Sequence, residues 1–330
     1  MKSIEEFSFA DEPGKIQTKA NIKQTIERPR ISIVTPFYNA ERNFEQTYHC
    51  VINQSMQEFE WVIVDDGSSR PGVIALLEEY SEKDARIHVI RQKNQGQSVA
   101  KNNGIRNSKA DVIAFLDADD LIEPFYLETL YKALQEHPDA SWSYTDLVGF
   151  EGQKYIWCKP FSAGRMTFNN TLVNAALFRK KDLEEIDCFP EKWKHYDEDW
   201  ALYLKLLEAG KHPVHVPVIG FWYRRSDTGM KQTVRKNEKL RKQSDNYIAE
   251  IAKKIDIHIK GEEYKGELPQ EAVKTTFSSK ENLLAGILST RLGVEIVSSD
   301  CLAKTQVYAK SKDDVYGLTP ARCWKVKRRG

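Results

Sequence analysis

The sequence predicts a mixed α/β domain with a mostly parallel sheet flanked by helices. Two observations support this fold class. Short runs rich in Val and Ile alternate with stretches of helical periodicity over residues 31–116, and each run is followed directly by polar residues. Because neighbouring parallel strands need a long crossover between them, such alternation is typical of parallel sheets, whose ligands bind at the carboxyl ends of the strands.

The first predicted strand-helix-strand unit spans residues 31–64. Residues 31–35 form a β-branched run ended by Pro36, and residues 61–64 form a second run followed by Asp65 and Asp66. Between them, residues 41–54 carry apolar side chains near helical spacing. Both runs are therefore predicted to be buried strands with a polar loop at the carboxyl end.

The same alternation continues along the chain. Strands are predicted at residues 87–90 and 111–116, and helices at residues 73–80, 98–107, 124–135, 199–209, 235–257 and 279–290. Gly210 ends the fourth of these helices. Residues 142–178 show no clear period and are predicted to be less regular.

The chain is expected to contain one main domain with two additions. Its 330 residues exceed the length of an average single domain. Residues 1–29 are polar and close on Arg28-Pro29-Arg30, which predicts a weakly structured extension. The main domain is expected over residues 30–230, followed by a C-terminal helical or mixed appendage over residues 231–330.

Bulk composition excludes several classes of function. Lys+Arg total 49 and Asp+Glu total 48, so the net charge of +1 gives no reason to expect a nucleic-acid partner. No apolar run is long enough to cross a bilayer, and the acidic N-terminus lacks an apolar segment. Five scattered cysteines, odd in number, favour a reducing, cytoplasmic setting.

The most informative motif is Asp117-Ala118-Asp119, directly after a predicted strand. Two carboxylates one residue apart at a strand end can both face a crevice, and hard oxygen ligands suit Mg²⁺ or Mn²⁺ bridging a diphosphate. A solvated acidic turn that caps the next helix is the alternative interpretation.

Five motifs in order carry a resemblance to a known family. They are residues 31–39 (ISIVTPFYN), residues 62–69 (VIVDDGSS), the Asn94-x-Gly96-x-Ser98-x-Ala100-Lys101-Asn102-x-Gly104 segment, Asp117-x-Asp119, and Asp197-Glu198-Asp199-Trp200. This set resembles the family 2 glycosyltransferases, inverting enzymes with the Rossmann-like GT-A fold, over about residues 30–230. The resemblance implies a nucleotide-sugar donor, a divalent metal (Mn or Mg), and a glycan or lipid-linked glycan acceptor in surface polysaccharide synthesis.

The resemblance also implies a nucleotide-binding set. Pro36 and Tyr38 would lie against the nucleobase, and Asp65 would accept a hydrogen bond from the base imide, which favours uracil. Gly96 would allow close approach of the chain to the nucleotide, and Lys101 would offer charge to the phosphates. The alternatives are a surface aromatic for Tyr38, an Asx turn for Asp65 or Asp66, and a solvent-exposed helical lysine for Lys101.

For catalysis, the resemblance implies that Asp117 and Asp119 bind the metal and that Asp199 is the general base. Glu198 would orient the acceptor or the base. Alternatively, the acidic run at residues 197–199 only provides an N-cap and first-turn charges for the helix that follows.

The sequence departs from the family pattern at two positions. Lys101 stands where relatives usually have Arg, and lysine lacks the bidentate fork of a guanidinium. Ser226 stands where relatives often have a His that helps to hold metal or diphosphate. Arg224 and Arg225 are expected to compensate by contacting phosphate oxygens.

Two further features leave alternatives open. The basic helix over residues 235–254 either contacts the inner face of an anionic membrane or presents a solvated face. Trp193, His195 and Tyr196 either line the acceptor site or pack in the scaffold.

Two other functions compete with sugar transfer. A sugar nucleotidyltransferase usually has a glycine-rich loop with a basic residue after the first strand, whereas this chain has Pro36-Phe37-Tyr38-Asn39. A degenerate protein that binds sugar or nucleotide without turnover is the non-enzymatic alternative, and only a turnover assay separates it from an active transferase.

Overall fold

The computed structural model describes most of the predicted main domain. Side chains are described for residues 1–3, 6–15, 24–157, 160–191, 197–225 and 237–275, and the backbone of four more strands is described between residues 295 and 325. The predictions for Trp193, His195, Tyr196 and Ser226, and for the helix at residues 279–290, lie outside the described residues.

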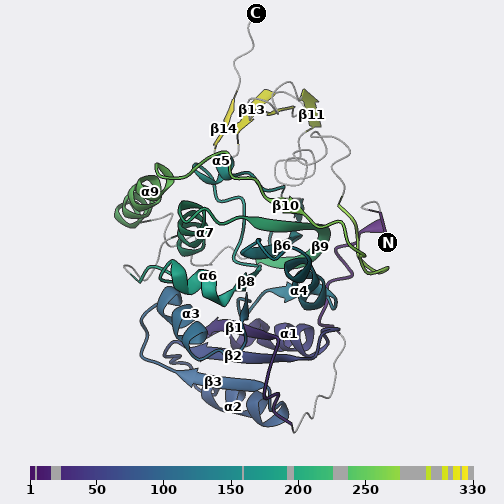
Figure 1. The fold of residues 1–330 in the computed structure, drawn as a ribbon, viewed down its shortest axis with the longest axis vertical. Coiled ribbons are helices and arrows are strands. Elements are labelled where there is room, and N and C mark those ends of the chain that lie inside the picture. Colours follow the sequence, from purple (N-terminus) through teal and green to yellow (C-terminus); the bar gives the residue numbers. More distant parts are fainter. Residues whose placement is uncertain are drawn as a thin grey trace, which may run out of the picture.

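A mostly parallel sheet forms the centre of the molecule, as predicted (Figure 1). Its strand order is β10-β9-β6-β8-β4-β1-β2-β3, with β5 and β7 paired to β9 and β6. The first half contains β1 (Ile31–Phe37), β2 (Phe59–Asp65), β3 (Ile87–Arg91) and β4 (Val112–Phe115), all parallel to one another. The carboxyl ends of β1, β2 and β4 therefore lie on the same edge.

The helices of this half follow the predicted order. They are α1 (Glu41–Ile52), α2 (Val73–Lys83), α3 (Gln97–Arg106) and α4 (Tyr126–Glu136), with the short strand β5 (Leu121–Ile122) before α4. Each lies within a few residues of its predicted range, because the apolar spacing that indicated a helix is also the face that packs on the sheet.

The second half of the domain is more regular than its sequence predicted. Residues 142–178, expected to be irregular, contain the strands β6 (Trp142–Glu151) and β7 (Tyr155–Trp157), the short helix α5 (Ala163–Met166) and the start of β8 (Leu177–Arg179). Strand β6 pairs with the long strand β9 (Pro213–Arg225). Buried polar residues such as Ser143 and Asp146 interrupt the apolar pattern of β6, which is why periodicity did not reveal it.

Three more helices are described: α6 (Lys180–Glu185), α7 (Glu198–Glu208) and α9 (Glu238–Ala252). Strand β10 (Glu262–Glu263) is the edge strand beside β9. A separate antiparallel sheet contains β11 (Glu295–Ser298), β12 (Val307–Lys310), β13 (Val315–Thr319) and β14 (Arg322–Lys325). None of the helices described in the chain is long and apolar enough to cross a membrane.

Helices cover both faces of the sheet, so the central strands are buried on both sides (Figure 1). In β1, Ile31 and Ile33 join the core under α1, α2 and α4, whereas Val34 joins the core under α3, α7 and α9. Helix α3 approaches β1 closely: a Cβ on Gly104 would lie 2.3 Å from Val34 Cγ1. Only glycine allows α3 to pack this tightly on β1.

The N-terminal residues that the structure describes pack against the domain. Phe7 lies 5.4 Å from Trp222 between ring centroids, and Gln46 donates a 3.0 Å hydrogen bond to the Pro13 carbonyl. Lys2 bridges to Val273, and Val218 of β9 bridges to Lys274, so the N-terminal segment and residues 273–274 meet beside β9. The indole N–H of Trp222 donates to Glu123 Oε1 at 2.7 Å. The polar composition of this segment gave no sign of these contacts.

Glu123 generates a pH-dependent prediction. Burial raises its pKa from 4.5 to about 7, and the hydrogen bond from Trp222 opposes this shift only in part. A carboxyl whose folded pKa is raised stabilises the protein below its unfolded pKa and loses that contribution as the pH rises through about 7. Glu123→Gln keeps the acceptor and removes the charge, so it is expected to increase the free energy of unfolding by about 2 kcal/mol at pH 8.

Urea unfolding of Glu123→Gln and wild type at pH 8 and pH 4.5 measures this difference. The gain is expected to vanish at the lower pH, where both side chains are neutral. The exposed Glu82→Gln serves as the matched control and is expected to change little at either pH. An equal effect of Glu123→Gln at both pH values would contradict the assignment.

Candidate active site

The candidate site lies where the carboxyl ends of β1, β2 and β4 meet. The loops at residues 38–40, 65–70 and 117–120 follow these strands directly. Helix α7 and the carboxyl end of β9 also border the site. Asp199 of α7 acts electrostatically on Lys101 of α3, and Arg224 of β9 acts on Asp119 in the loop after β4. Crevices of this kind are the usual ligand sites of open parallel sheets.

Asn39 fixes the first two loops to each other. Its Oδ1 accepts hydrogen bonds from the amides of Ser69 and Arg70, both at 3.0 Å, and its own amide donates to Ser68 Oγ. Asn39 adopts a positive φ of 50°, which asparagine tolerates better than most residues. Sequence reasoning missed this role, although an Asn at the end of a strand loop is a recognisable signal. The neighbouring Tyr38 is 51% exposed, so its ring is accessible to a ligand.

Asp65 and Asp66 both have structural roles. Asp65 Oδ1 accepts a hydrogen bond from the Ser68 amide at 2.9 Å, which is the Asx turn considered for this pair. Asp66 receives the amides of Gln95 and Gly96, both at 2.8 Å, and so holds the loop that leads into α3. Gly96 has φ of 98° at the start of α3, a conformation that favours glycine.

Lys101 is fully buried, so the alternative of a solvent-exposed lysine is wrong. Its Nζ lies 3.2 Å from Glu198 Oε1 and 3.9 Å from Asp117 Oδ1. The ammonium group also lies 5.3 Å from the centroid of the Phe189 ring. Burial by itself would lower the pKa of Lys101, but Asp117, Glu198 and Asp199 together raise it. Lys101 is therefore a charged group that connects α3, the Asp117 loop and α7.

Asp117 and Asp119 interact electrostatically in the loop after β4. Burial and then the negative charge of Asp117 raise the pKa of Asp119 to about 6, and Arg224 only partly offsets them. Two carboxylates that repel each other in this way fit a bound divalent ion, which would relieve the repulsion. Gln97 donates to Asp117 Oδ1 at 3.1 Å and orients it. No group of three or more His, Cys, Asp or Glu side chains suited to a metal occurs within the described ranges, so the pair would need ligands from substrate or water.

Each of the three guanidinium nitrogens of Arg224 contacts a protein group. Its Nε donates to the Asp119 carbonyl at 2.6 Å, and its other nitrogens contact Glu151 and Gln46. The expectation that Arg224 contacts phosphate is therefore not supported by its hydrogen bonds. Arg225 differs, because its buried Nε has no hydrogen-bond partner within the described part of the chain. Of the two arginines, Arg225 is the one with an N–H left unpaired among the described residues.

Asp199 lies in the first turn of α7 with both carboxylate oxygens positioned by donors. Asn170 Nδ2 donates to Oδ2 at 3.1 Å, and the Trp200 amide donates to Oδ1 at 2.8 Å. Asp197 occupies the N-cap position without a side-chain capping bond and accepts a hydrogen bond from Ser244 of α9 instead. The acidic run at residues 197–199 therefore does more than cap the helix.

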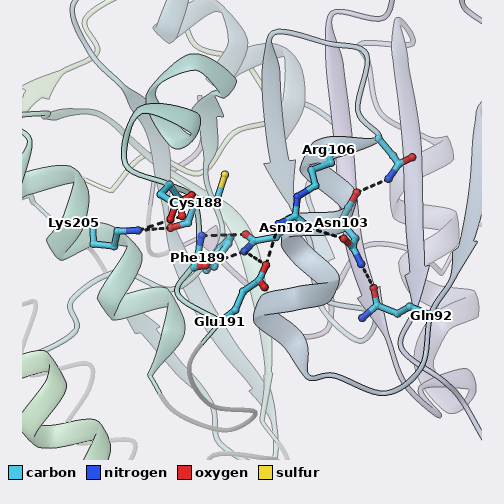
Figure 2. A network of polar contacts seen from close by, with 10 residues as sticks. Gln92, Asn102, Asn103, Arg106, Cys188, Phe189, Glu191 and Lys205 are labelled. Atoms are coloured by element: carbon cyan, nitrogen blue, oxygen red, sulfur yellow. Dashed lines mark hydrogen bonds and ion pairs between the residues drawn. The ribbon is translucent and has the colours of Figure 1, made fainter.

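Side chains of α3 hold the segment that leads toward α7 (Figure 2). Asn102 donates to the Phe189 carbonyl and to Glu191, both at 2.8 Å, and accepts the Phe189 amide in return. Arg106 contacts the same Glu191, and Lys205 of α7 donates to the Cys188 carbonyl. This network links α3, which carries Lys101, to α7, which carries Asp199, through residues 188–191.

Comparisons with known proteins identify the family of this chain. The family model "Glycosyl transferase family 2" matches residues 32–193. TuaG from Bacillus subtilis (strain 168), named as a teichuronic acid biosynthesis glycosyltransferase, is 36% identical over 189 residues, which cover 56% of this chain and 74% of TuaG. The chain belongs to glycosyltransferase family 2.

Two other matches are partial. Glycosyltransferase GlyA from Streptococcus pneumoniae serotype 4 is 31% identical over 157 residues, 47% of this chain and 22% of GlyA. The crystal structure of residues 1–349 of S. aureus TarS with UDP-GlcNAc has a TM-score of 0.52 at 20% identity, covering 62% of this chain and 61% of that one. The TarS match confirms the GT-A fold of this glycosyltransferase.

The Lys101–Glu198 pair generates a stability prediction. Lys101→Met keeps the length of the side chain but leaves the buried Glu198 without its counter-charge, so the free energy of unfolding is expected to fall by about 3–5 kcal/mol at pH 8. The double variant Lys101→Met/Glu198→Leu is expected to recover most of this loss, because apolar replacement of both partners removes the buried charge. Urea unfolding measures the free energy of unfolding of both variants. If Lys101→Met were as stable as wild type, the Lys101–Glu198 pair would not contribute to stability.

Proposed function

We propose that this protein is an inverting, metal-dependent glycosyltransferase that moves a sugar from a UDP-sugar to a hydroxyl of a glycan or lipid-linked glycan. The observation that carries the proposal is the convergence of Asp117 and Asp199 around the buried Lys101, which both carboxylates influence electrostatically. These residues come from three separate segments, so their meeting at the carboxyl edge of the sheet is a property of the fold.

The nucleoside site is assigned to the loops after β1 and β2. Tyr38 offers an accessible ring face, Pro36 lies beside it at the end of β1, and the Ser68 amide occupies only Oδ1 of Asp65. An aromatic face with one acceptor suits the imide edge of uracil. Gly96 brings the backbone near the nucleotide. TarS, a neighbour in fold, is described with UDP-GlcNAc, which supports uracil as the base.

The diphosphate site is assigned to Asp117, Asp119 and Arg225. Asp117 and Asp119 would hold a Mn²⁺ or Mg²⁺ ion, and when bound the ion would neutralise charge on the departing nucleoside diphosphate. Arg225 supplies a buried N–H that has no partner among the residues the structure describes. Lys101, for which the resemblance implies a contact to the phosphates, is assigned to hold Asp117 relative to α7.

Asp199 is assigned as the general base. It removes the proton from the acceptor hydroxyl while that oxygen forms a bond to the anomeric carbon and the bond to the diphosphate oxygen breaks. The donors from Asn170 and Trp200 hold the carboxylate in one orientation, and each carboxylate oxygen keeps a lone pair for the proton. One base and one metal site are sufficient for a single inverting displacement.

The acceptor is proposed to be a glycan of the cell surface. TuaG is named for teichuronic acid biosynthesis, and an O-antigen biosynthesis protein of Myxococcus xanthus is 31% identical over 147 residues. Lys239, Arg241 and Lys242 are exposed on α9, and this basic face would suit the anionic cytoplasmic surface of a membrane that carries a lipid-linked acceptor.

Replacement of the proposed base tests the mechanism. Asp199→Asn preserves the shape of the side chain but cannot accept the proton, so kcat is expected to fall by about 10²–10⁴. A panel of nucleotide sugars, assayed by nucleotide release, first identifies the donor that wild type uses. Asp197→Asn is the matched control, because Asp197 contacts Ser244 of α9 and is expected to retain near wild-type turnover. Unchanged turnover in Asp199→Asn would remove it from this role.

Metal dependence is tested separately. Turnover is expected to disappear after chelation and to return with Mn²⁺ or Mg²⁺. Asp117→Asn is expected to raise the metal concentration for half-maximal turnover by about tenfold or more, because one anionic oxygen ligand is lost. Nucleotide release measured against metal concentration checks this, and full turnover in excess chelator would contradict the metal site.

A further inference from the structure

The side-chain amide of Asn174 is buried without any hydrogen-bond partner. Both Nδ2 and Oδ1 are closed to solvent, and neither atom has a partner in the part of the chain that the structure describes. Among those residues Asn174 is the one with two polar side-chain atoms left in this state. Buried polar atoms are almost always paired, so an amide with both ends unpaired indicates a group whose partner is a ligand.

Asn174 and the Asp117 loop lie at the same end of the β4–β8 pair. Strands β4 and β8 are antiparallel, with Val112 opposite Arg179 and Ala114 opposite Leu177. Asn174 comes three residues before β8 begins and Asp117 comes two residues after β4 ends, so both segments leave the sheet at one edge. The Ala175 amide donates to the Val173 carbonyl at 2.7 Å, so the chain makes a tight turn at Asn174 as it enters β8.

The same segment also reaches the predicted base. Asn170, four residues earlier, donates to Asp199 Oδ2 at 3.1 Å. Tyr203 of α7 donates to the Val173 carbonyl at 2.9 Å. Residues 170–174 therefore extend from the carboxylate assigned to the acceptor proton toward the carboxylates assigned to the diphosphate. The sugar that is transferred must lie between those two positions, because its anomeric carbon is attacked on one side and loses diphosphate on the other.

We propose that Asn174 binds a hydroxyl group of the sugar being transferred and so contributes to donor selection. This inference rests on the proposed function. A sugar hydroxyl both donates and accepts, so it can satisfy Oδ1 and Nδ2 of one amide, either alone or with its neighbour on the ring. A phosphate offers only acceptors and a metal ion only accepts lone pairs, so either would leave half of the amide unpaired. The chemistry of Asn174 thus selects the sugar over the diphosphate.

Deoxygenated donors test the contact directly. The donor identified by the panel and its monodeoxy analogues, each lacking one hydroxyl, are compared in wild type and Asn174→Ala by kcat/KM. One analogue is expected to lose about tenfold or more in wild type, because the buried amide is left unpaired. The same analogue is expected to lose less than about threefold in Asn174→Ala, since coupled losses do not add. Asn169→Ala, on the same loop, is the matched control and is expected to follow wild type.

Thermal unfolding distinguishes binding from a structural role. Without a donor, Asn174→Ala is expected to keep or raise the unfolding midpoint, because it removes an unpaired buried polar group. Asn174→Ser is measured as a second variant with a smaller change in volume. A lowered midpoint in both variants, together with equal analogue losses in the variants and wild type, would overturn the assignment while leaving the transferase activity in place. A wild-type protein that turns over no nucleotide sugar would overturn the proposed function and this assignment together.

Discussion

The buried ammonium group of Lys101 connects the parts of the site that must act together. It lies on α3, contacts Glu198 of α7, and is close to Asp117 at the end of β4. A lysine removed from water is stable only when several negative groups surround it, and here Asp117, Glu198 and Asp199 supply that charge. Because the buried ammonium group needs these carboxylates nearby, it keeps α3, the Asp117 loop and α7 close together. A positive centre of this kind both stabilises the folded protein and keeps the two sets of carboxylates at a fixed separation.

Arg224 of β9 is a second contact that fixes the Asp117–Asp120 loop. Arg224 donates its backbone amide to Asp120 Oδ1 at 2.8 Å and its guanidinium to the Asp119 carbonyl. These bonds hold the buried Asp120 and the backbone of the loop, and Lys101 lies 3.9 Å from Asp117 on the α3 side. The negative charges of Asp117 and Asp119 still repel each other, and a divalent cation would relieve that repulsion.

The first half of the domain could be predicted from sequence because its strands are apolar and its helices have one apolar face. The helices α7 and α9 of the second half were also predicted, but its strands were not, since β6 and β9 carry buried polar groups whose partners lie far along the chain. Asp146 of β6, for example, accepts a hydrogen bond from Thr275 and pairs with His215 of β9 at 2.9 Å. No local pattern distinguishes such a strand from a loop, because its polar residues are stabilised only after the sheet has formed.

The sequence by itself determined the fold class, the family resemblance and the identity of the acidic motifs, because these depend on residue order and local spacing. Tertiary structure alone decided what each charged residue does. Lys101 donates a hydrogen bond to Glu198, 97 residues away in the sequence, and Arg224 donates one to the Asp119 carbonyl, 105 residues away. It also decided that the side-chain amide of Asn174 is buried without a partner among the described residues. Burial and pairing are set by which segments the sheet brings together, so residue types and spacing could not distinguish a phosphate ligand from a buried ion pair.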